Sequence, residues 1–403
     1  MSRPKILVLT STLPRWKGDT EPAFVESLSL ELADYFDVTV LAPRARGSAR
    51  DEVLDRGNRS IRIRRFRYFI PGLESLANEG GIMVRIARNP LRAMLVPFFL
   101  IAQFFAVFGL HRRERFDAMH AHWLIPQGLV AATYSSLSGS APPFLVTSHG
   151  TDLHGLHGSI MTRLKRWVLH KASHVTVVSE AMREKAVLLG CDESRITVRS
   201  MGVDLQSVFI PDGQERSGLA FVGRLVDVKG ALVLIDALAT LVEQHPDLRL
   251  TIVGDGPERA AVERKIARHD LVDNVVIMGR LPSAAVADIL RSAAVFAMPS
   301  VETRSGAQEG FGLVTIEAMG CGCPVVASSL PGVRDAVLDG ETGLFAAPGD
   351  AKDLADKIGR LLDDGELRCS LATRGRKFAM ENFDWPVVGQ RYADLLLDII
   401  PAA

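Results

Sequence analysis

Two glutamates eight positions apart mark the segment of this sequence with the clearest chemical potential. The stretch 309–317 reads Glu-Gly-Phe-Gly-Leu-Val-Thr-Ile-Glu, in which an apolar run follows two glycines. A helix that begins after the second glycine leaves Glu309 in the preceding loop and carries Glu317 almost two turns inside, at ~1.5 Å rise per residue. Such carboxylates can accept sugar or ribose hydroxyls, and helix amides beside them favour a phosphate. These amides belong to the first turn, around Phe311, Gly312, Leu313 and Val314. The alternative is an ordinary solvated loop and helix face, because short patterns have many false positives.

Two cations follow the strand predicted at residues 219–222. Arg224 and Lys229 lie in the loop that joins this strand to a helix starting near Ala231. Open parallel sheets bind ligands at the carboxyl ends of their strands. A guanidinium and an ammonium at that edge can neutralise a departing diphosphate without a metal. The alternative is a solvated loop with a surface lysine, and the position of the loop argues against it.

Histidines follow two other predicted strands. In Ser-His-Gly-Thr-Asp, His149 stands at a strand end, and Asp152 is placed to orient its ring or to cap the next turn. A lone histidine is more often structural than catalytic, but the strand end favours a functional one. His120 and His122 alternate on one strand. No carboxylate or third histidine has matching spacing, so packing or acceptor contact is favoured over metal binding.

The loop after the first predicted strand contains Trp16, Lys17 and Gly18. Such an indole is placed to contact an acceptor, and the glycine would let the backbone approach a phosphate. An exposed irregular loop is the alternative interpretation.

Several ligand motifs are missing from the sequence. It contains no Gly-x4-Gly-Lys-Ser/Thr, no Gly-x-Gly-x-x-Gly after the first strand and no Asp-x-Asp. Four cysteines do not form a disulfide framework in so long a chain, and the amino-terminal apolar stretch is too short for a secretory signal. We therefore expect no metal, no cofactor and a cytoplasmic setting, with phosphate bound by Arg, Lys and helix amides.

The length and the alternation of apolar runs predict two doubly wound α/β domains. A chain of 403 residues exceeds one ordinary core. Short strands alternate with helices. They are expected at 6–9, 38–41, 118–120, 144–147, 175–178 and 196–198, then at 219–222, 250–253, 275–278, 295–298 and 325–327. The expected domains are 1–210 and 211–383, with a final helix at 384–403 that crosses back onto the first domain.

Charge is distributed unevenly along the chain. Residues 1–200 hold 27 Lys and Arg against 18 Asp and Glu, although the whole chain has a formal charge of +0. A basic half can rest on an anionic surface. Nucleic acid is not an expected partner, because no reader motif is present.

The segment 93–110 has no charged side chain and five phenylalanines, and arginines flank it. Its length almost reaches a membrane span, but the next strand must stay in the same sheet. A helix packed in the core and a helix lying in a bilayer interface both remain open. The alternating basic stretch 61–69 supports the second slightly, unless it is an edge strand with a solvated basic face.

These elements together resemble the family 4 retaining glycosyltransferases. The resemblance rests on the Pro-Arg-Trp-Lys-Gly-Asp loop, Ser148-His-Gly, Gly223-Arg-Leu through Lys229-Gly, and the Glu309/Glu317 pair. The family implies the GT-B fold, in which two Rossmann-like domains face a cleft. The departures are Gly18-Asp19, where many members have two glycines, and an insertion at 302–308.

The resemblance also implies roles for these residues. It implies that Arg224 and Lys229 hold the donor diphosphate and that Glu317 takes the ribose hydroxyls. It implies that Glu309 and the following amides hold donor sugar and phosphate, and that His149 contacts the sugar near the reacting carbon. Arg280, in Met-Gly-Arg-Leu-Pro, matches the base-contacting loop.

The expected activity is retaining transfer of a hexose from a UDP- or GDP-linked sugar to a hydroxyl of a glycan or lipid-linked acceptor. The setting would be cell-surface polysaccharide or glycolipid synthesis, with peripheral contact to the inner face of an anionic membrane. The alternatives are a nucleotide-sugar epimerase on the same fold and a non-catalytic sugar-nucleotide binder at the membrane.

Overall fold

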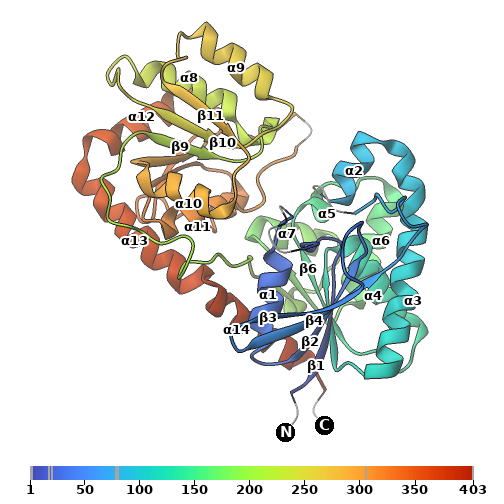
Figure 1. Cartoon of the computed structure of the whole chain (residues 1–403). Coiled ribbons are helices and arrows are strands. Elements are labelled where there is room, and N and C mark those ends of the chain that lie inside the picture. Colours follow the sequence, from blue (N-terminus) through green and yellow to red (C-terminus); the bar gives the residue numbers. More distant parts are fainter. Residues whose placement is uncertain (1–2, 17–18, 20, 78–80, 305, 402–403) are drawn as a thin grey trace. The chain divides into compact units, whose positions relative to one another are not determined.

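Two parallel sheets organise the chain in the computed structural model (Figure 1). The structure describes residues 3–16, 19, 21–77, 81–304 and 306–401. By contacts the chain divides into two compact units. Unit 1 comprises Met1–Val178, Met182–Met201 and Val388–Ala403, and unit 2 comprises Ser179–Ala181 and Gly202–Val387. The units are defined by contacts alone. The domain limits expected from the sequence, 1–210, 211–383 and 384–403, therefore stay a prediction.

Unit 1 contains a sheet of eight strands in its described residues, in the order β3-β4-β2-β1-β5-β6-β7-β8. All neighbours pair in parallel except β3 and β4. Most of the parallel strands are apolar and buried on both faces, as expected when helices cover both sides. The strands are β1 (Lys5–Leu9), β2 (Asp37–Pro43), β3 (Asp51–Arg56), β4 (Arg59–Phe66), β5 (Ala118–His122), β6 (Phe144–Ser148), β7 (His174–Val177) and β8 (Ile196–Val198).

The helical elements of this half of the chain include one long apolar helix, α3. In chain order they are α1 (Phe24–Leu32), α2 (Ile82–Arg88), η1 (Pro90–Leu95), α3 (Val96–Glu114), η2 (Leu124–Gly128), α4 (Leu129–Leu137), α5 (Thr151–His154), α6 (Ser159–Lys171), α7 (Glu180–Leu188) and η3 (Glu193–Arg195).

Unit 2 contains a sheet of six strands in its described residues, in the order β11-β10-β9-β12-β13-β14, with all neighbours parallel. Its core lies between these strands and helices α8, α9 and α12. The strands are β9 (Leu219–Val222), β10 (Leu250–Val253), β11 (Val275–Gly279), β12 (Val295–Met298), β13 (Val325–Ser328) and β14 (Leu344–Ala346). The helical elements are η4 (Asp227–Lys229), α8 (Ala231–Leu241), α9 (Arg259–Arg268), α10 (Ser283–Ser292), α11 (Leu313–Gly320), η5 (Pro331–Val333), α12 (Ala351–Asp363) and α13 (Gly365–Phe383).

The last helix, α14 (Trp385–Ile399), begins in unit 2 and packs mostly in unit 1. Its contact with α1 is close, because a Cβ at Gly389 would lie 2.4 Å from the Cβ of Glu31. Tyr392 is fully buried and stacks on His120 with ring centroids 5.5 Å apart. The prediction that the final helix crosses back onto the first domain is therefore confirmed.

The basic stretch 61–69 is not an edge strand, so this alternative was wrong. It forms most of β4, which pairs with β2 on one side and with β3 on the other. Four arginines of β4 are ion-paired rather than presented as a bare basic face: Arg59 with Glu31 and Asp34, Arg62 with Asp37 and Glu114, Arg64 with Asp51, and Arg65 with Glu52. This stretch therefore gives little support to membrane binding.

The apolar segment 93–110 lies mainly in α3, which is packed on one side only. The buried stripe consists of Phe99, Gln103, Val107 and His111, and the opposite face is exposed. The prediction of a core-packed helix is thus correct for this stripe and wrong for the rest of the helix. By length and composition, Pro90–Glu114 is the one helical stretch in the described residues that could span a membrane, and a single such match is weak support.

Candidate active site

The carboxyl ends of β9 and β12 form the switch point of the unit 2 sheet, where the strand order reverses. The loop after β9 is held against the end of β12 by Gly230. Its φ is +66°, and a Cβ there would lie 1.9 Å from the carbonyl oxygen of Pro299. Val301 N also donates to Val228 O at 2.9 Å. These contacts fix the position of Lys229 at the ligand-binding edge of the sheet.

Lys229 and Glu309 form an ion pair at this edge. The Lys229 Nζ donates to Glu309 Oε2, and the two side chains are only 23% and 13% exposed. Gly310 N donates to Glu309 Oε1 at 3.2 Å. Burial opposes ionisation of Glu309, but the Lys229 ammonium and the amides of Phe311 and Gly310 outweigh it and lower the pKa of the carboxyl. The structure therefore brings together the cation and the carboxylate that the sequence suggested.

Glu317 lies near the same ammonium, on α11. This helix begins at Leu313, so Glu317 is its fifth residue, little more than one turn inside rather than almost two. Burial raises the pKa of Glu317 to about 7, and Lys229 acts in the opposite direction. A carboxyl group that titrates near neutrality is typical of ligand-binding sites, although structural burial has the same effect.

Arg224 and Arg280 follow β9 and β11 at the carboxyl edge of the sheet, and both side chains are exposed. No hydrogen bond or ion pair of either guanidinium is recorded within the part of the chain that the structure describes. Their position allows phosphate or base contact. Among these described residues, no group of three His, Cys, Asp or Glu side chains could hold a metal ion.

The unit 1 sheet also has a switch point, between β1 and β5. Gln127 is fully buried there and links the ends of the two strands. In the amide orientation that satisfies both contacts, it accepts from Ser11 N at 3.1 Å and donates to His122 O at 3.0 Å. This amide fixes the backbone at the end of β5. It therefore also fixes the position of His122, which pairs with His149.

His149 is surrounded by three rings. Its ring stacks on His122 with centroids 5.3 Å apart, and the rings of Phe24 and Trp123 lie 4.9 Å and 5.0 Å from it. His122 Nδ1 and His149 Nε2 are 3.0 Å apart and share a hydrogen bond, so at least one ring is neutral. The His120 ring lies against that of His122, with centroids 4.2 Å apart and the planes tilted by 38°, and it bonds to Thr147 Oγ1 at 2.8 Å.

All three histidines are neutral at physiological pH. Burial lowers the pKa of His149 to about 3, and burial with the nearby His149 lowers the pKa of His120 to about 3. Burial, with His120 and His149 as neighbours, also lowers the pKa of His122. This cluster can therefore offer neutral hydrogen bonds and ring surface but does not act as a charged acid near pH 7.

Asp152 holds the backbone rather than the His149 ring. Its carboxylate accepts from Leu124 N at 2.6 Å and from Ser148 Oγ at 2.8 Å, and the residue is buried. No bond from Asp152 to the imidazole is recorded in the described ranges. Of the two roles suggested for this residue, its contacts fit the capping of local backbone and leave little surface for an acceptor.

Trp16 is 47% exposed, and the Arg15 guanidinium lies 4.4 Å from its ring centre. Arg15 is also paired with Asp19 at 2.7 Å. The indole is thus available on the surface, and its role in acceptor binding stays a prediction. Gly18 and Lys17 lie outside the described residues.

Sequence reasoning missed two residues that position the site. Gln127 was overlooked because a buried glutamine has no motif of its own. Gly254 was overlooked although Gly-Asp-Gly follows a strand. A Cβ at Gly254 would lie 1.8 Å from Gly223 O, so this glycine lets the Arg224 loop pack directly on the neighbouring strand end.

Comparison with known proteins assigns each half of the chain to a family model. Residues 23–207 match Glycosyltransferase Family 4, and residues 210–378 match Glycosyl transferases group 1.

Two curated relatives agree with these matches. An uncharacterized glycosyltransferase of Methanocaldococcus jannaschii is 31% identical over 276 residues, covering 68% of this chain and 72% of the relative. The GDP-mannose-dependent alpha-(1-6)-phosphatidylinositol monomannoside mannosyltransferase of Mycolicibacterium smegmatis is 28% identical and covers 97% of this chain and 98% of the relative.

Solved structures show the same architecture. The Anabaena protein Alr3699/HepE, in complex with UDP-glucose, superposes with a TM-score of 0.70 at 21% identity, covering 98% of this chain and 99% of that one. The two Rossmann-like domains of this chain therefore have the GT-B fold, as predicted.

Proposed function

Because the chain belongs to glycosyltransferase family 4, whose members are retaining hexosyltransferases, we propose that it moves a hexose from a UDP- or GDP-linked sugar to a hydroxyl acceptor. The observation that carries this proposal is the cluster of Lys229, Glu309 and Glu317 at the switch point of the unit 2 sheet. Such a cluster suits a ligand that has both a diphosphate and sugar hydroxyls.

We assign the diphosphate to Lys229 and Arg224. The Lys229 ammonium is engaged by the Glu309 carboxylate, and a donor phosphate would be an equally charged replacement partner. Arg224 is exposed beside it and can form a bidentate contact with phosphate oxygens. As the bond to the sugar breaks, negative charge grows on the leaving diphosphate, and both cations stabilise it.

The two glutamates take different parts of the donor in this proposal. Glu309 is ionised and lies before α11, where it can accept hydroxyl hydrogens of the donor sugar. Glu317 takes the ribose hydroxyls. The backbone amides of Gly312 and Leu313 supply donors for the phosphate, and the Phe311 amide, which bonds to the Glu309 carboxylate, lies next to them. Arg280 contacts the base, which the family resemblance also suggests.

His149 contacts the donor sugar as a neutral group. Its low pKa leaves it uncharged, so it can hydrogen-bond to a sugar hydroxyl without repelling the oxocarbenium-like charge that develops on the ring. His122 fixes the orientation of the His149 ring through their shared hydrogen bond. We class His122 as a positioning residue.

The proposed transfer needs no side chain as a general base, because the leaving phosphate takes the acceptor proton. The bond from the anomeric carbon to the diphosphate oxygen breaks, and the acceptor oxygen bonds to the same face of that carbon. The acceptor proton passes to the released phosphate oxygen. A double displacement with Glu309 as nucleophile is less favoured, because the same-face route needs no nucleophile from the protein.

The acceptor is proposed to be a hydroxyl of a glycan or of a lipid-linked sugar, used at the inner face of the cell membrane in surface polysaccharide or glycolipid synthesis. Support comes from the Mycolicibacterium smegmatis relative, whose name specifies a phosphatidylinositol monomannoside mannosyltransferase. Further support comes from the exposed apolar face of α3.

A donor panel tests the proposal. Thermal stabilisation should appear with one or two nucleotide sugars, because a ligand that binds the native state raises its stability. Hydrolysis or transfer should follow with the same donors, and the product should keep the donor anomeric configuration. A 2-epimer product formed without an acceptor would instead indicate an epimerase. Binding without any turnover would indicate a sensor.

A further inference from the structure

One face of α3 is apolar and uncovered. Phe98, Ile101, Phe105 and Phe108 recur at spacings of three and four residues, so they share one side of the helix. They are 50%, 56%, 63% and 41% exposed. This side lies opposite the stripe that packs on the protein. Exposed apolar surface of this extent usually marks an interaction site.

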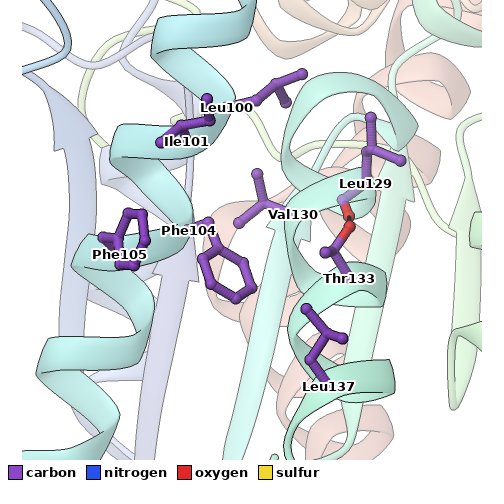
Figure 2. Close-up of a pocket in the computed structure, with 8 residues that line it drawn as sticks. All are labelled: Leu100, Ile101, Phe104, Phe105, Leu129, Val130, Thr133 and Leu137. Atoms are coloured by element: carbon purple, nitrogen blue, oxygen red, sulfur yellow. Dashed lines mark hydrogen bonds between the residues drawn. The ribbon is translucent and has the colours of Figure 1, made fainter.

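A groove beside this face is almost entirely apolar. It has a volume of about 360 Å³ and lies between α3 and α4, with Leu100 and Phe104 pointing toward α4 (Figure 2). The other lining residues are Ile101, Phe105, Leu129, Val130, Thr133 and Leu137. Thr133 is the one polar side chain among them, and its hydroxyl already donates to Leu129 O at 2.7 Å. The groove side chains thus offer no unsatisfied polar group, so the complementary occupant is a hydrocarbon.

Arginines stand at both ends of the apolar face. The stretch 82–115 contains six arginines and a single acidic residue, Glu114, which is paired with Arg62 of β4 at 2.9 Å. Arg88 lies before the amino-terminal end of α3, whereas Arg112 and Arg113 lie in its last turn. All three side chains are exposed. An apolar helix face with basic ends matches the boundary between acyl chains and anionic headgroups.

A second copy of the chain is a poor match for this face. Two α3 helices that pair in either direction bring arginine-rich ends together, because both ends are basic. A membrane crossing fits poorly as well. The strands on either side of this segment, β4 and β5, belong to the same sheet, and α3 packs against β4 and α4. The helix therefore stays in the helical layer of unit 1.

We propose that this surface docks on an anionic phospholipid bilayer, with α3 lying in the interface and the α3–α4 groove taking an acyl chain of a lipid. The purpose, presenting a lipid-linked acceptor to the enzyme, rests on the proposed function. The docking itself does not. Binding combines burial of the exposed side chains with attraction of the flanking arginines to lipid phosphate.

Vesicle binding by the full chain tests the docking. The protein should cosediment with vesicles of phosphatidylcholine containing about a quarter phosphatidylglycerol, and less with phosphatidylcholine alone. The double variant Ile101→Gln/Phe105→Gln should bind about ten-fold or more weakly, since each side chain loses its burial in lipid. Leu188→Gln is the matched control, an 82% exposed leucine on α7 that should bind as the wild type does.

A second pair of variants tests the contribution of the arginines to vesicle binding. Arg112→Gln/Arg113→Gln should weaken binding to the anionic vesicles several-fold and leave the weak binding to neutral vesicles unchanged. Arg264→Gln, an exposed arginine on α9, is the control for loss of a positive charge. Equal loss in both variants would overturn the assignment of the arginines to this surface.

The groove is tested with brominated acyl chains. A tryptophan introduced by Thr133→Trp should be quenched by vesicles whose lipids have bromine on the chain, and one introduced by Leu188→Trp should not. Quenching of neither, or unchanged vesicle binding by Ile101→Gln/Phe105→Gln, overturns the proposal. Concentration-dependent dimerisation without vesicle binding would assign the face to a second copy and also overturn it.

Donor binding separates the two proposals. The Ile101→Gln/Phe105→Gln variant should keep thermal stabilisation by the nucleotide sugar and transfer to a water-soluble acceptor, while transfer to a lipid-linked acceptor falls. If the wild type binds vesicles but no nucleotide sugar, the proposed function fails and the docking surface stands. If it turns over donors but ignores anionic vesicles, the docking surface fails.

Discussion

The two sheets place different chemistry at equivalent positions. In both, polar residues lie at the switch point, where a ligand is expected. In unit 2 these residues are charged, with Lys229 paired to Glu309 beside Glu317. In unit 1 they are neutral imidazoles stacked among aromatic rings. The same topology thus supports either a charged or an uncharged edge, and the choice depends only on which side chains follow the strands.

The difference agrees with two neighbouring parts of a nucleotide sugar, the diphosphate and the hexose. Its diphosphate is anionic and needs fixed cations, whereas its hexose is uncharged and becomes positive only as the bond breaks. This interpretation predicts that charge is indispensable at the unit 2 edge and harmful at the unit 1 edge.

The largest expected effect comes from removing the cation at the charged edge. Lys229→Ala should lower kcat/KM by ~10²–10³-fold, the usual loss when one group stabilising developing charge is deleted. The fold should survive, since the side chain is partly exposed on a loop. Steady-state kinetics with the donor found in the panel measures the loss. Lys352→Ala, at the exposed start of α12, is the control, and a Lys229→Ala enzyme within about three-fold of wild type would contradict the donor-site assignment.

The neutral edge should be more tolerant. His122→Phe keeps a ring in the stack but removes the hydrogen bond to His149, and kcat should fall by about 10–100-fold, by analogy with residues that orient a metal-ligating histidine. The KM for the donor should change little.

A double-mutant cycle distinguishes positioning from a direct role for His122. Once His149 is replaced by Ala, His122→Phe should cost almost nothing more. Fully additive losses would show that His122 acts independently of His149. His157→Phe, at an exposed histidine, controls for the substitution type.

The pH dependence should come from the charged edge alone. With the pKa of Glu317 at about 7, donor affinity should rise between about pH 6 and pH 8 as the carboxylate becomes a full acceptor for ribose hydroxyls. His149, with a pKa of about 3, should add no inflection near pH 6.5. Titration of donor binding by calorimetry measures this, and Glu317→Gln should flatten the curve. A persisting inflection in that variant would assign the titration elsewhere.

Stability should move in the opposite direction. The pKa of folded Glu317 lies above the usual 4.5, so the protonated form favours the native state. That contribution is complete below about pH 4.5 and is lost as the pH rises through about 7. Urea unfolding at pH 5 and pH 8 should therefore show a smaller difference for Glu317→Gln than for the wild type.

The smallest effect concerns a buried polar group away from both edges. Both polar atoms of the Gln103 side chain are buried without a partner in the described part of the chain. Gln103→Leu should raise the free energy of unfolding by ~1–2 kcal/mol, because an unsatisfied buried amide is costly. Activity should not change. Thermal unfolding measures the gain. A destabilised variant would mean that the Gln103 amide makes a stabilising polar contact.

The sequence was sufficient for the β–α alternation because buried parallel strands are continuous apolar runs. Strands β3 and β14 were not predicted. The first is largely charged and exposed at a sheet edge, and the second has only three residues. The cations and carboxylates of unit 2 were also predicted, since the cations follow strands and the two glutamates flank the start of α11. Their roles stay predictions.

The extent to which α3 is buried could not be predicted from the sequence, because the composition of a helix does not show which elements pack against it. Helix α8 is also apolar and is buried, since it packs against the sheet, α9 and α12. Helix α3 has α4 on one side and leaves its outer face open. The pairing of His122 with His149 was also missed, although β5 and β6 lie in register with His122 opposite Thr147. A strand register is a tertiary fact that one sequence does not supply.

Helix α14 has a consequence for biogenesis. Four of its side chains are buried in unit 1: Val388, Tyr392, Ala393 and Leu396. The Tyr392 ring stacks on His120, which in turn contacts His122. Residues of α14 thus complete the core of a unit whose other two segments precede the main segment of unit 2 in the chain. Unit 1 cannot reach its native state until α14 has emerged from the ribosome, whereas most of unit 2 precedes α14 in the chain and can form earlier. A fragment ending before α14 should therefore emerge with an unfinished core and require chaperone protection.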